Sequence, residues 1–174
     1  MKNSFLFYAA VLLTSCGPTI RVYTDHDRDV NVLTYSSYTW LDTKEIEVRN
    51  NPLYYNELND KRIKAAVNEE LRKHGYNRSD SGARLVVHYH IVVENRATVQ
   101  VDRYGYRYGS YWMTSGISSY PYQEGTLIID LMEPGTNLLA WRGWAVAVVN
   151  DYTSEQQEAL IRKAVEKIFR RYPN

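Results

Sequence analysis

Two histidines, His88 and His90, have the spacing that best suits metal chemistry. They stand two apart within Leu85–Glu94, where apolar residues alternate as in a β-strand, so both side chains share one face. A catalytic zinc needs three protein ligands and a structural zinc four. Further side chains of suitable type show no ligand spacing of their own: His26, His74, Glu94 and Asp130. We therefore expect no metal and no other cofactor, and place both histidines on a half-solvated strand face.

The acidic run Asp25–Asp29 imitates the start of a calcium-binding loop. Such a loop needs glycine at its sixth position and glutamate at its twelfth. Val30 and Ser36 occupy these positions, so the run is interpreted as a charged turn or strand end.

Catalytic motifs are absent from the sequence. It contains no Gly-x-Ser-x-Gly elbow, no phosphate-binding loop, no His-Glu-x-x-His and no dinucleotide-binding glycine pattern. Asp130 and Arg142 lie on strands expected to be neighbours, which favours a cross-strand ion pair, with ligand anchoring as the alternative. We expect no enzymatic activity and no catalytic residues.

The only cysteine, Cys16, directly follows a signal-like segment. Met1–Ser4 carries one positive charge, and the apolar run Phe5–Leu13 is about nine residues long, too short for a membrane span of about 20 residues. Leu13–Gly17 resembles a bacterial lipobox, in which Cys16 is lipidated and becomes the new N-terminus. The alternative is an ordinary secretory signal with a chance cysteine. Residues 1–15 are thus predicted to be the signal peptide, and 16–19 a short lipidated tether.

A lipid anchor at Cys16 has consequences for location. Two or three acyl chains hold a protein firmly on a membrane, whereas one chain binds only marginally. Gly17 rather than aspartate follows Cys16, so the usual inner-membrane retention signal is missing. We expect an outer-membrane location that faces the periplasm.

The most unusual composition lies in Arg103–Trp112, in a chain with 16 tyrosines. Tyrosine and tryptophan suit glycan stacking, membrane interfaces and protein interfaces, because each has an apolar body and a polar tip. The alternative is that the rings pack on the sheet or belong to a loop without a ligand. The segment Ser115–Ser119 is interpreted as a loop. The candidate binding surface consists of Tyr104, Tyr106, Tyr108, Tyr111 and Trp112.

The remaining patterns predict one α+β domain over residues 20–174. Short strands are expected at Ile20–Thr24 and Ser37–Leu41, and a hairpin is expected to join the strand that ends near Leu131 to the one that starts at Leu138. Amphipathic helices are predicted over residues 55–74, with Asn59 or Asn56 as the cap and Gly75 at the end, and from a capping box at Thr153–Gln156 to just before Pro173. The expected fold is an antiparallel sheet with both helices packed on one face.

Several segments together resemble a family of bacterial lipoproteins described as domain of unknown function 4136. They are Val22–Asp27, Tyr35–Leu41, His74–Tyr76, Tyr122–Leu131 and Leu139–Gly143, followed by the C-terminal helix. The resemblance covers nearly the whole chain after Cys16. It implies a compact α+β envelope lipoprotein, with no assigned activity and no catalytic residues to transfer.

These features favour a non-enzymatic accessory or interaction module that is tethered to the membrane. The formal net charge is +1 and no basic stripe is present, so nucleic acid is not an expected partner. An envelope protein is the leading partner. The alternative is a small lipid or glycan, bound through the tyrosine-rich segment and a cavity between sheet and helices.

Overall fold

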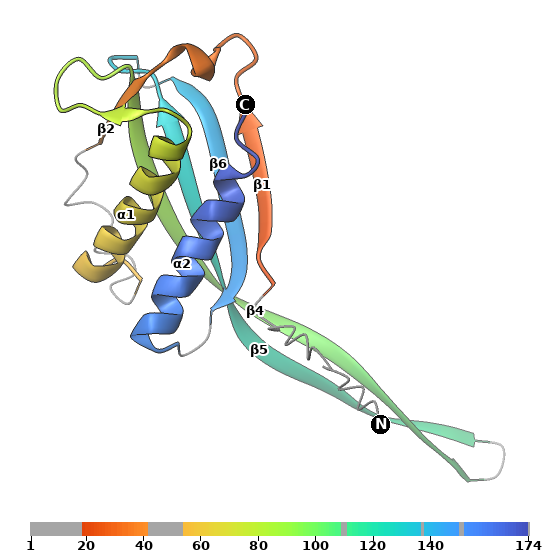
Figure 1. The fold of residues 1–174 in the computed structure, drawn as a ribbon. Helices are drawn as coiled ribbons and strands as arrows, with labels where there is room; N and C mark the ends of the chain where they lie inside the picture. Colours follow the sequence, from red (N-terminus) through yellow and green to blue (C-terminus); the bar gives the residue numbers. More distant parts are fainter. Residues whose placement is uncertain (1–18, 42–53, 109–110, 137, 150–151, 174) are drawn as a thin grey trace, which may run out of the picture.

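The computed structural model describes residues 19–41, 54–108, 111–136, 138–149 and 152–173, and side chains are described for all of these except 100–118. Its elements, in chain order, are β1 (Arg21–His26), the short 3-10 helix η1 (Val32–Thr34), β2 (Ser37–Trp40), α1 (Glu57–Lys73), β3 (Asn77–Arg78), β4 (Leu85–Tyr108), β5 (Tyr111–Met132), β6 (Leu139–Val149) and α2 (Ser154–Phe169). The strands form one six-stranded sheet in the order β1-β6-β5-β4-β2-β3 (Figure 1).

The sheet is mostly antiparallel. β1, β6, β5 and β4 pair in antiparallel fashion, whereas β2 runs parallel to both β3 and β4. Because β5 and β6 pair from Gln123–Val149 to Met132–Leu139, the predicted hairpin is confirmed. The predicted α+β class is therefore confirmed as well.

Both predicted helices form, and their caps explain where they begin and end. The Asn56 side chain accepts a hydrogen bond from the Asn59 backbone N–H, so Asn56 rather than Asn59 is the cap of α1. Gly75 ends this helix at a φ of +86°, in the left-handed region that favours glycine. At α2, the side chains of Thr153 and Gln156 form the predicted capping box.

The core contains rows of side chains that share one sheet face. Residues paired across antiparallel strands lie on the same face. Two successive rows are Val87–Leu131–Trp141 and Tyr89–Ile129–Gly143. From α1, Asp60 accepts a hydrogen bond of 2.9 Å from the Tyr89 hydroxyl. From α2, the Phe169 ring lies 5.6 Å from the Trp141 ring, so each helix contacts this set of rows.

Large aromatic rings fill the end of the core where the chain finishes. Trp141, Phe169 and Tyr172 contact one another, and the hydroxyls of Tyr76 and Tyr172 lie 2.7 Å apart. Tyr76 also lies within hydrogen-bond distance of the Val32 carbonyl, at 2.7 Å. Burial raises the pKa of Tyr172 well above its usual value, and the hydrogen bond with the Tyr76 hydroxyl raises it further. This end of the core is therefore densely packed.

β4 and β5 continue as a two-stranded arm beyond the rest of the sheet, as Figure 1 shows. We define the β4–β5 arm as Arg96–Tyr108 and Tyr111–Tyr122; its backbone pairs from Arg96–Tyr122 to Tyr108–Tyr111, with a register shift between Val101 and Tyr104. The interpretation of Ser115–Ser119 as a loop is wrong, because these residues lie within β5. Pairing with β4 keeps them extended although their small polar side chains give no strand pattern.

Candidate functional site

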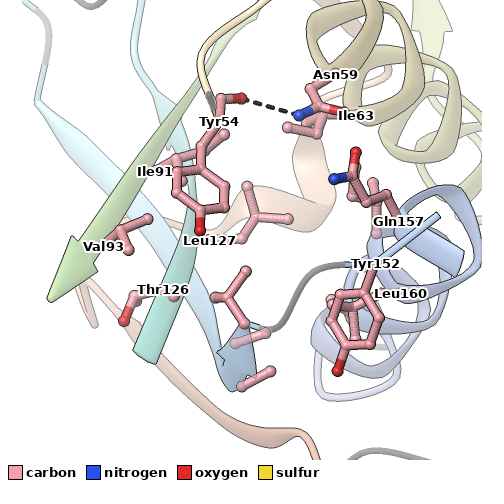
Figure 2. Close-up of a pocket in the computed structure, with 16 residues that line it drawn as sticks. Tyr54, Asn59, Ile63, Ile91, Val93, Thr126, Leu127, Tyr152, Gln157 and Leu160 are labelled. Carbon is pink, nitrogen blue, oxygen red and sulfur yellow. Dashed lines mark hydrogen bonds between the residues drawn. The ribbon is translucent and has the colours of Figure 1, made fainter. Parts of the chain in front are cut away.

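An apolar pocket lies between the sheet and the two helices, near the base of the β4–β5 arm (Figure 2). Its volume is about 110 Å³, on the scale of an engineered cavity of about 150 Å³ that binds benzene. It is lined by Tyr54, Asn59, Ile63, Ile91, Val93, Gly125, Thr126, Leu127, Ala145, Ala147, Val149, Tyr152, Gln157, Leu160, Ile161 and Ala164.

Small side chains keep this pocket open. Ala145 and Ala147 line it from β6, and Ala164 lines it from α2. At the other end of the same layer, Trp141 from β6 and Phe169 from α2 fill the corresponding space. The difference in side-chain volume along β6 and α2 therefore leaves room at one end of the core only.

Several polar groups beside the pocket have partners within the protein. The Asn59 amide nitrogen donates to the Tyr54 carbonyl at 3.1 Å, and its amide oxygen accepts from Arg62 at 3.1 Å. The Tyr54 hydroxyl donates to Gln123 at 2.9 Å. The pocket thus offers a guest mainly dispersion contacts and removal from water, which suits an apolar group.

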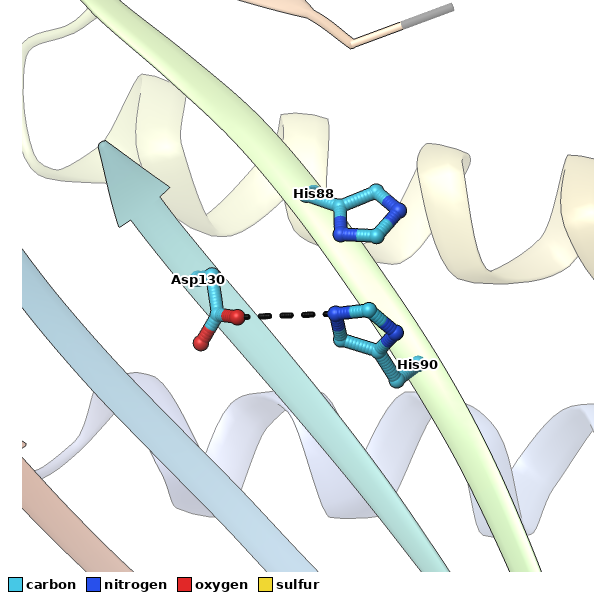
Figure 3. A group of neighbouring side chains, drawn as sticks. All are labelled: His88, His90 and Asp130. Carbon is cyan, nitrogen blue, oxygen red and sulfur yellow. Dashed lines mark ion pairs between the residues drawn. The ribbon is translucent and has the colours of Figure 1, made fainter. Parts of the chain in front are cut away.

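A second cluster lies on the sheet face that alternates with the core rows. His88 pairs directly with Asp130 across β4 and β5, and Asp130 pairs with Arg142 across β5 and β6. Arg142 donates two hydrogen bonds to the Asp130 carboxylate, at 2.6 and 2.7 Å. The His90 ring nitrogen Nε2 lies 3.6 Å from Asp130 Oδ2 (Figure 3). The predicted ion pair between Asp130 and Arg142 is confirmed.

The cluster brings together three side chains that bind metals in other proteins. Ligand atoms of His88, His90 and Asp130 all lie within 4.8 Å of one another. However, Arg142 already engages both carboxylate oxygens and balances their charge, and Asp130 in turn raises the pKa of Arg142 above its usual value. The arrangement is that of a largely buried, charge-balanced ion pair with histidines beside it.

The candidate residues from the sequence have different positions relative to these two features. Cys16 lies outside the described residues. The tyrosine-rich segment forms the far end of the β4–β5 arm, where Tyr108 pairs with Tyr111 and Arg107 with Trp112. Tyr104 and Tyr106 belong to the same stretch of β4, and the side chains of this segment are outside the description. The pocket and the histidine cluster are both formed by other residues, from the part of the chain whose side chains the structure describes.

Sequence reasoning did not identify the residues that line the pocket. One signal was present, because Ala145 and Ala147 alternate with Trp144, Val146 and Val148 along one strand. Two alanines on the face that carries Trp141 indicate a loss of volume on that face. Their position opposite Ala164 of α2 depends on how the helix packs, which no local pattern reveals.

None of the described helices combines the length and apolar character needed to cross a membrane.

One solved structure shares the fold at low sequence identity. A PDZ domain protein from Parabacteroides distasonis matches with 13% identity and a TM-score of 0.54, over 90% of this chain and 37% of that one. This chain therefore spans little more than a third of that protein. Two structures of a PelC dodecamer from Paraburkholderia phytofirmans match over 86% of this chain and 94–95% of theirs, with 9–10% identity and TM-scores of 0.44 and 0.45.

Comparison at the level of sequence gives a family without an assigned activity. Among curated proteins, none matches this chain. The family model of the domain of unknown function DUF4136 matches residues 22–174, which is most of the sequence. The chain is therefore a member of the DUF4136 family.

Proposed function

We propose that this protein is a non-enzymatic lipoprotein of the cell envelope that acts as an accessory interaction module and contacts a partner protein through the β4–β5 arm. In this proposal Cys16 carries the lipid, and the domain faces the periplasm from the outer membrane. In this proposal both helices pack on one face of the sheet, and the β4–β5 arm extends beyond the rest of the sheet (Figure 1).

The shape of the arm is the observation that carries this proposal. β6 ends its pairing with β5 at Gln123, and beyond this point β4 and β5 pair only with each other in the described part of the chain. Thirteen residues of a strand, Arg96–Tyr108, reach about 40 Å. A two-stranded ribbon is marginally stable in water unless a further surface covers it. An arm of this length is therefore best explained by a partner that it contacts.

The exposed apolar side chains near the base of the arm support the same interpretation. Val99 is 61% exposed and Tyr120 is 56% exposed. They lie on opposite faces of the ribbon, because Val99 pairs with Ser119 and Tyr120 pairs with Thr98. Each face thus exposes an apolar or aromatic side chain, of the kind that is typical of protein interfaces.

Crosslinking in intact cells tests the arm. The full-length protein is compared with a triple variant, Tyr106→Ala, Tyr108→Ala and Trp112→Ala. It is also compared with a shortened arm in which Asn-Gly replaces residues 99–119 and closes a two-residue turn between Thr98 and Tyr120, which pair across the ribbon. We expect a stoichiometric protein partner with the wild type, its loss with both variants, and an unchanged melting temperature for the triple variant. Retention of the partner by both variants would contradict the proposal.

Fractionation tests the anchor separately. Cys16→Ser is expected to move the mature protein from the membrane fraction to the soluble fraction. If the variant stays wholly with the membranes, lipidation is not what holds the protein there.

The apolar pocket favours a second candidate function, the binding of a small lipid. Its lining is predominantly aliphatic, and Tyr54 and Asn59 are already hydrogen-bonded, so it suits an acyl chain better than a glycan. A lipid ligand predicts a melting temperature that rises with ligand concentration.

A further inference from the structure

We propose that the apolar pocket holds the end of one acyl chain of the protein's own lipid anchor at Cys16. This inference rests on the lipidation of Cys16, which is part of the proposed function. It concerns an intramolecular contact, whereas the proposed function concerns the arm and an external partner.

The first argument is where the described chain begins. Arg21, the first residue of β1, pairs with Val146 of β6. The next residue of β6, Ala147, lines the pocket. Neighbouring strands lie about 4.8 Å apart, so the start of β1 is one strand away from the pocket wall.

A contact to α2 places the start of β1 near the other wall of the pocket. The Lys167 ammonium donates to the Ile20 carbonyl at 3.4 Å. Ala164, which lines the pocket, lies three residues before Lys167, so both are on the same side of α2. The chain that leads to Cys16 therefore departs beside the pocket.

The second argument is the length of the tether. Three residues lie between Cys16 and Ile20, and the four steps from one Cα atom to the other span at most about 14 Å. A lipid at Cys16 thus begins close to the pole of the domain that contains the pocket. The acyl groups on its glyceryl thioether and on its amine are the nearest apolar chains that the protein itself can supply.

The third argument is the chemistry of the pocket. Its lining is predominantly aliphatic, and the Tyr54 hydroxyl and the Asn59 amide beside it are hydrogen-bonded within the protein. The end of an acyl chain needs no hydrogen bonds and excludes water from such a lining. The remaining chains of the anchor stay in the bilayer, so one chain in the pocket does not abolish membrane attachment.

Photocrosslinking from inside the pocket tests this proposal on the full-length protein in native membranes. Tyr152, an aromatic lining residue, is replaced by p-benzoylphenylalanine, and Leu160 is replaced in a second variant because one position alone can perturb folding. The matched control places the same probe at Leu138, which is 58% exposed beside the turn between β5 and β6, at the opposite end of these strands. After irradiation, the digest is analysed by mass spectrometry.

We expect the pocket probes to be joined to the lipidated N-terminal peptide that starts at Cys16, and the control probe not to be. Ala147→Leu, which fills the pocket, should lower the yield to that of the control. A crosslink to a phospholipid, a crosslink to another peptide of this chain, or no crosslink overturns the inference.

The same digest distinguishes a failure of the lipid-anchor proposal from a failure of the pocket inference alone. An unmodified Cys16 peptide means that the lipid anchor, and with it this inference, is wrong. A lipidated Cys16 peptide that is never joined to the pocket probes overturns the inference alone and leaves the anchor and the arm unaffected.

Discussion

At the scale of single residues, Asp130 is the carboxylate whose environment matters most. Its side chain is 4% exposed, and its charge is balanced by two hydrogen bonds from Arg142. The side chain of the partner, Arg142, is itself 40% exposed. A carboxylate that has lost most of its water depends on such a partner, because an unpaired charge in the same place is costly.

Removal of Arg142 alone is therefore expected to destabilise the fold. Arg142→Met leaves Asp130 without its counter-charge, and because the arginine is partly exposed we expect a loss of about 2–3 kcal/mol in the free energy of unfolding, slightly below the range for fully buried pairs. The double variant Asp130→Leu/Arg142→Met removes both charges and should recover most of this loss. Urea unfolding measures both. A double variant as unstable as the single one would show that the ion pair is not the cause.

The buried hydroxyl of Tyr172 predicts a dependence of stability on alkaline pH. Burial and the Tyr76 hydroxyl raise its pKa in the folded protein, whereas the unfolded chain ionises near the usual value of about 10. The folded state thus keeps a proton that the unfolded state loses. Stability from this group is complete below about pH 10 and declines above it by about 1.4 kcal/mol per pH unit.

Tyr172→Phe removes this group and isolates its contribution. The difference in unfolding free energy between wild type and variant should be constant from pH 7 to 9 and should change in favour of the variant above about pH 10. Lysines and tyrosines remote from Tyr172 titrate in both proteins and cancel in the difference. The Tyr76 hydroxyl contacts Tyr172, so the comparison is repeated in a Tyr76→Phe background. If the unfolding free energies of the two proteins ran parallel up to pH 11, Tyr172 would ionise as easily in the folded protein as in the unfolded chain.

At the scale of elements, local patterns predicted the helices better than the long strands. The α1 boundaries follow from Asn56 and Gly75, and the start of α2 follows from the Thr153–Gln156 capping box, since caps are local signals. β4 was expected to end near Glu94 but continues to Tyr108. Past Glu94 the strand leaves the core, so its extension rests on pairing with β5 and not on apolar alternation.

The histidine cluster illustrates the same limit for a candidate site. The spacing of His88 and His90 placed them on one face, and the structure agrees. Their meeting with Asp130 depends on the register between β4 and β5, which is set across a hairpin whose connection was not recognised as strand. The pair Asp130–Arg142, by contrast, was predictable because a short turn joins β5 to β6.

Close packing of α2 on β6 gives a prediction at this scale. A Cβ at Gly143 would collide with the Ile168 side chain and with the Trp141 ring, which belongs to the densest part of the core. Gly143→Ala is therefore expected to lower the free energy of unfolding by about 1–3 kcal/mol, the usual cost of overpacking. Val148→Ala on the same strand is the control, because Val148 is an exposed position. If both substitutions changed the free energy of unfolding equally, α2 would accommodate the added methyl group without loss of stability.

At the scale of the whole molecule, a packed body is combined with a thin arm. The body has helices against the sheet and a continuous core, whereas the β4–β5 arm consists of two strands that pair with each other. Local stability follows the number of buried contacts and shared backbone hydrogen bonds. The two parts should therefore differ in how often their backbone hydrogen bonds open, although they belong to the same strands.

Hydrogen exchange measures this difference along β4 and β5. In the soluble Cys16→Ser form, we expect amides of the arm to exchange at least about 100-fold faster than those of Val87–Ile91 and Leu127–Leu131, because a two-stranded ribbon has little stability of its own. In native membranes, where the proposed partner is present, the arm should become protected while the body stays unchanged. Equal protection of arm and body in the soluble form would show that the ribbon is stable alone, and the argument that it needs a covering partner would then fail.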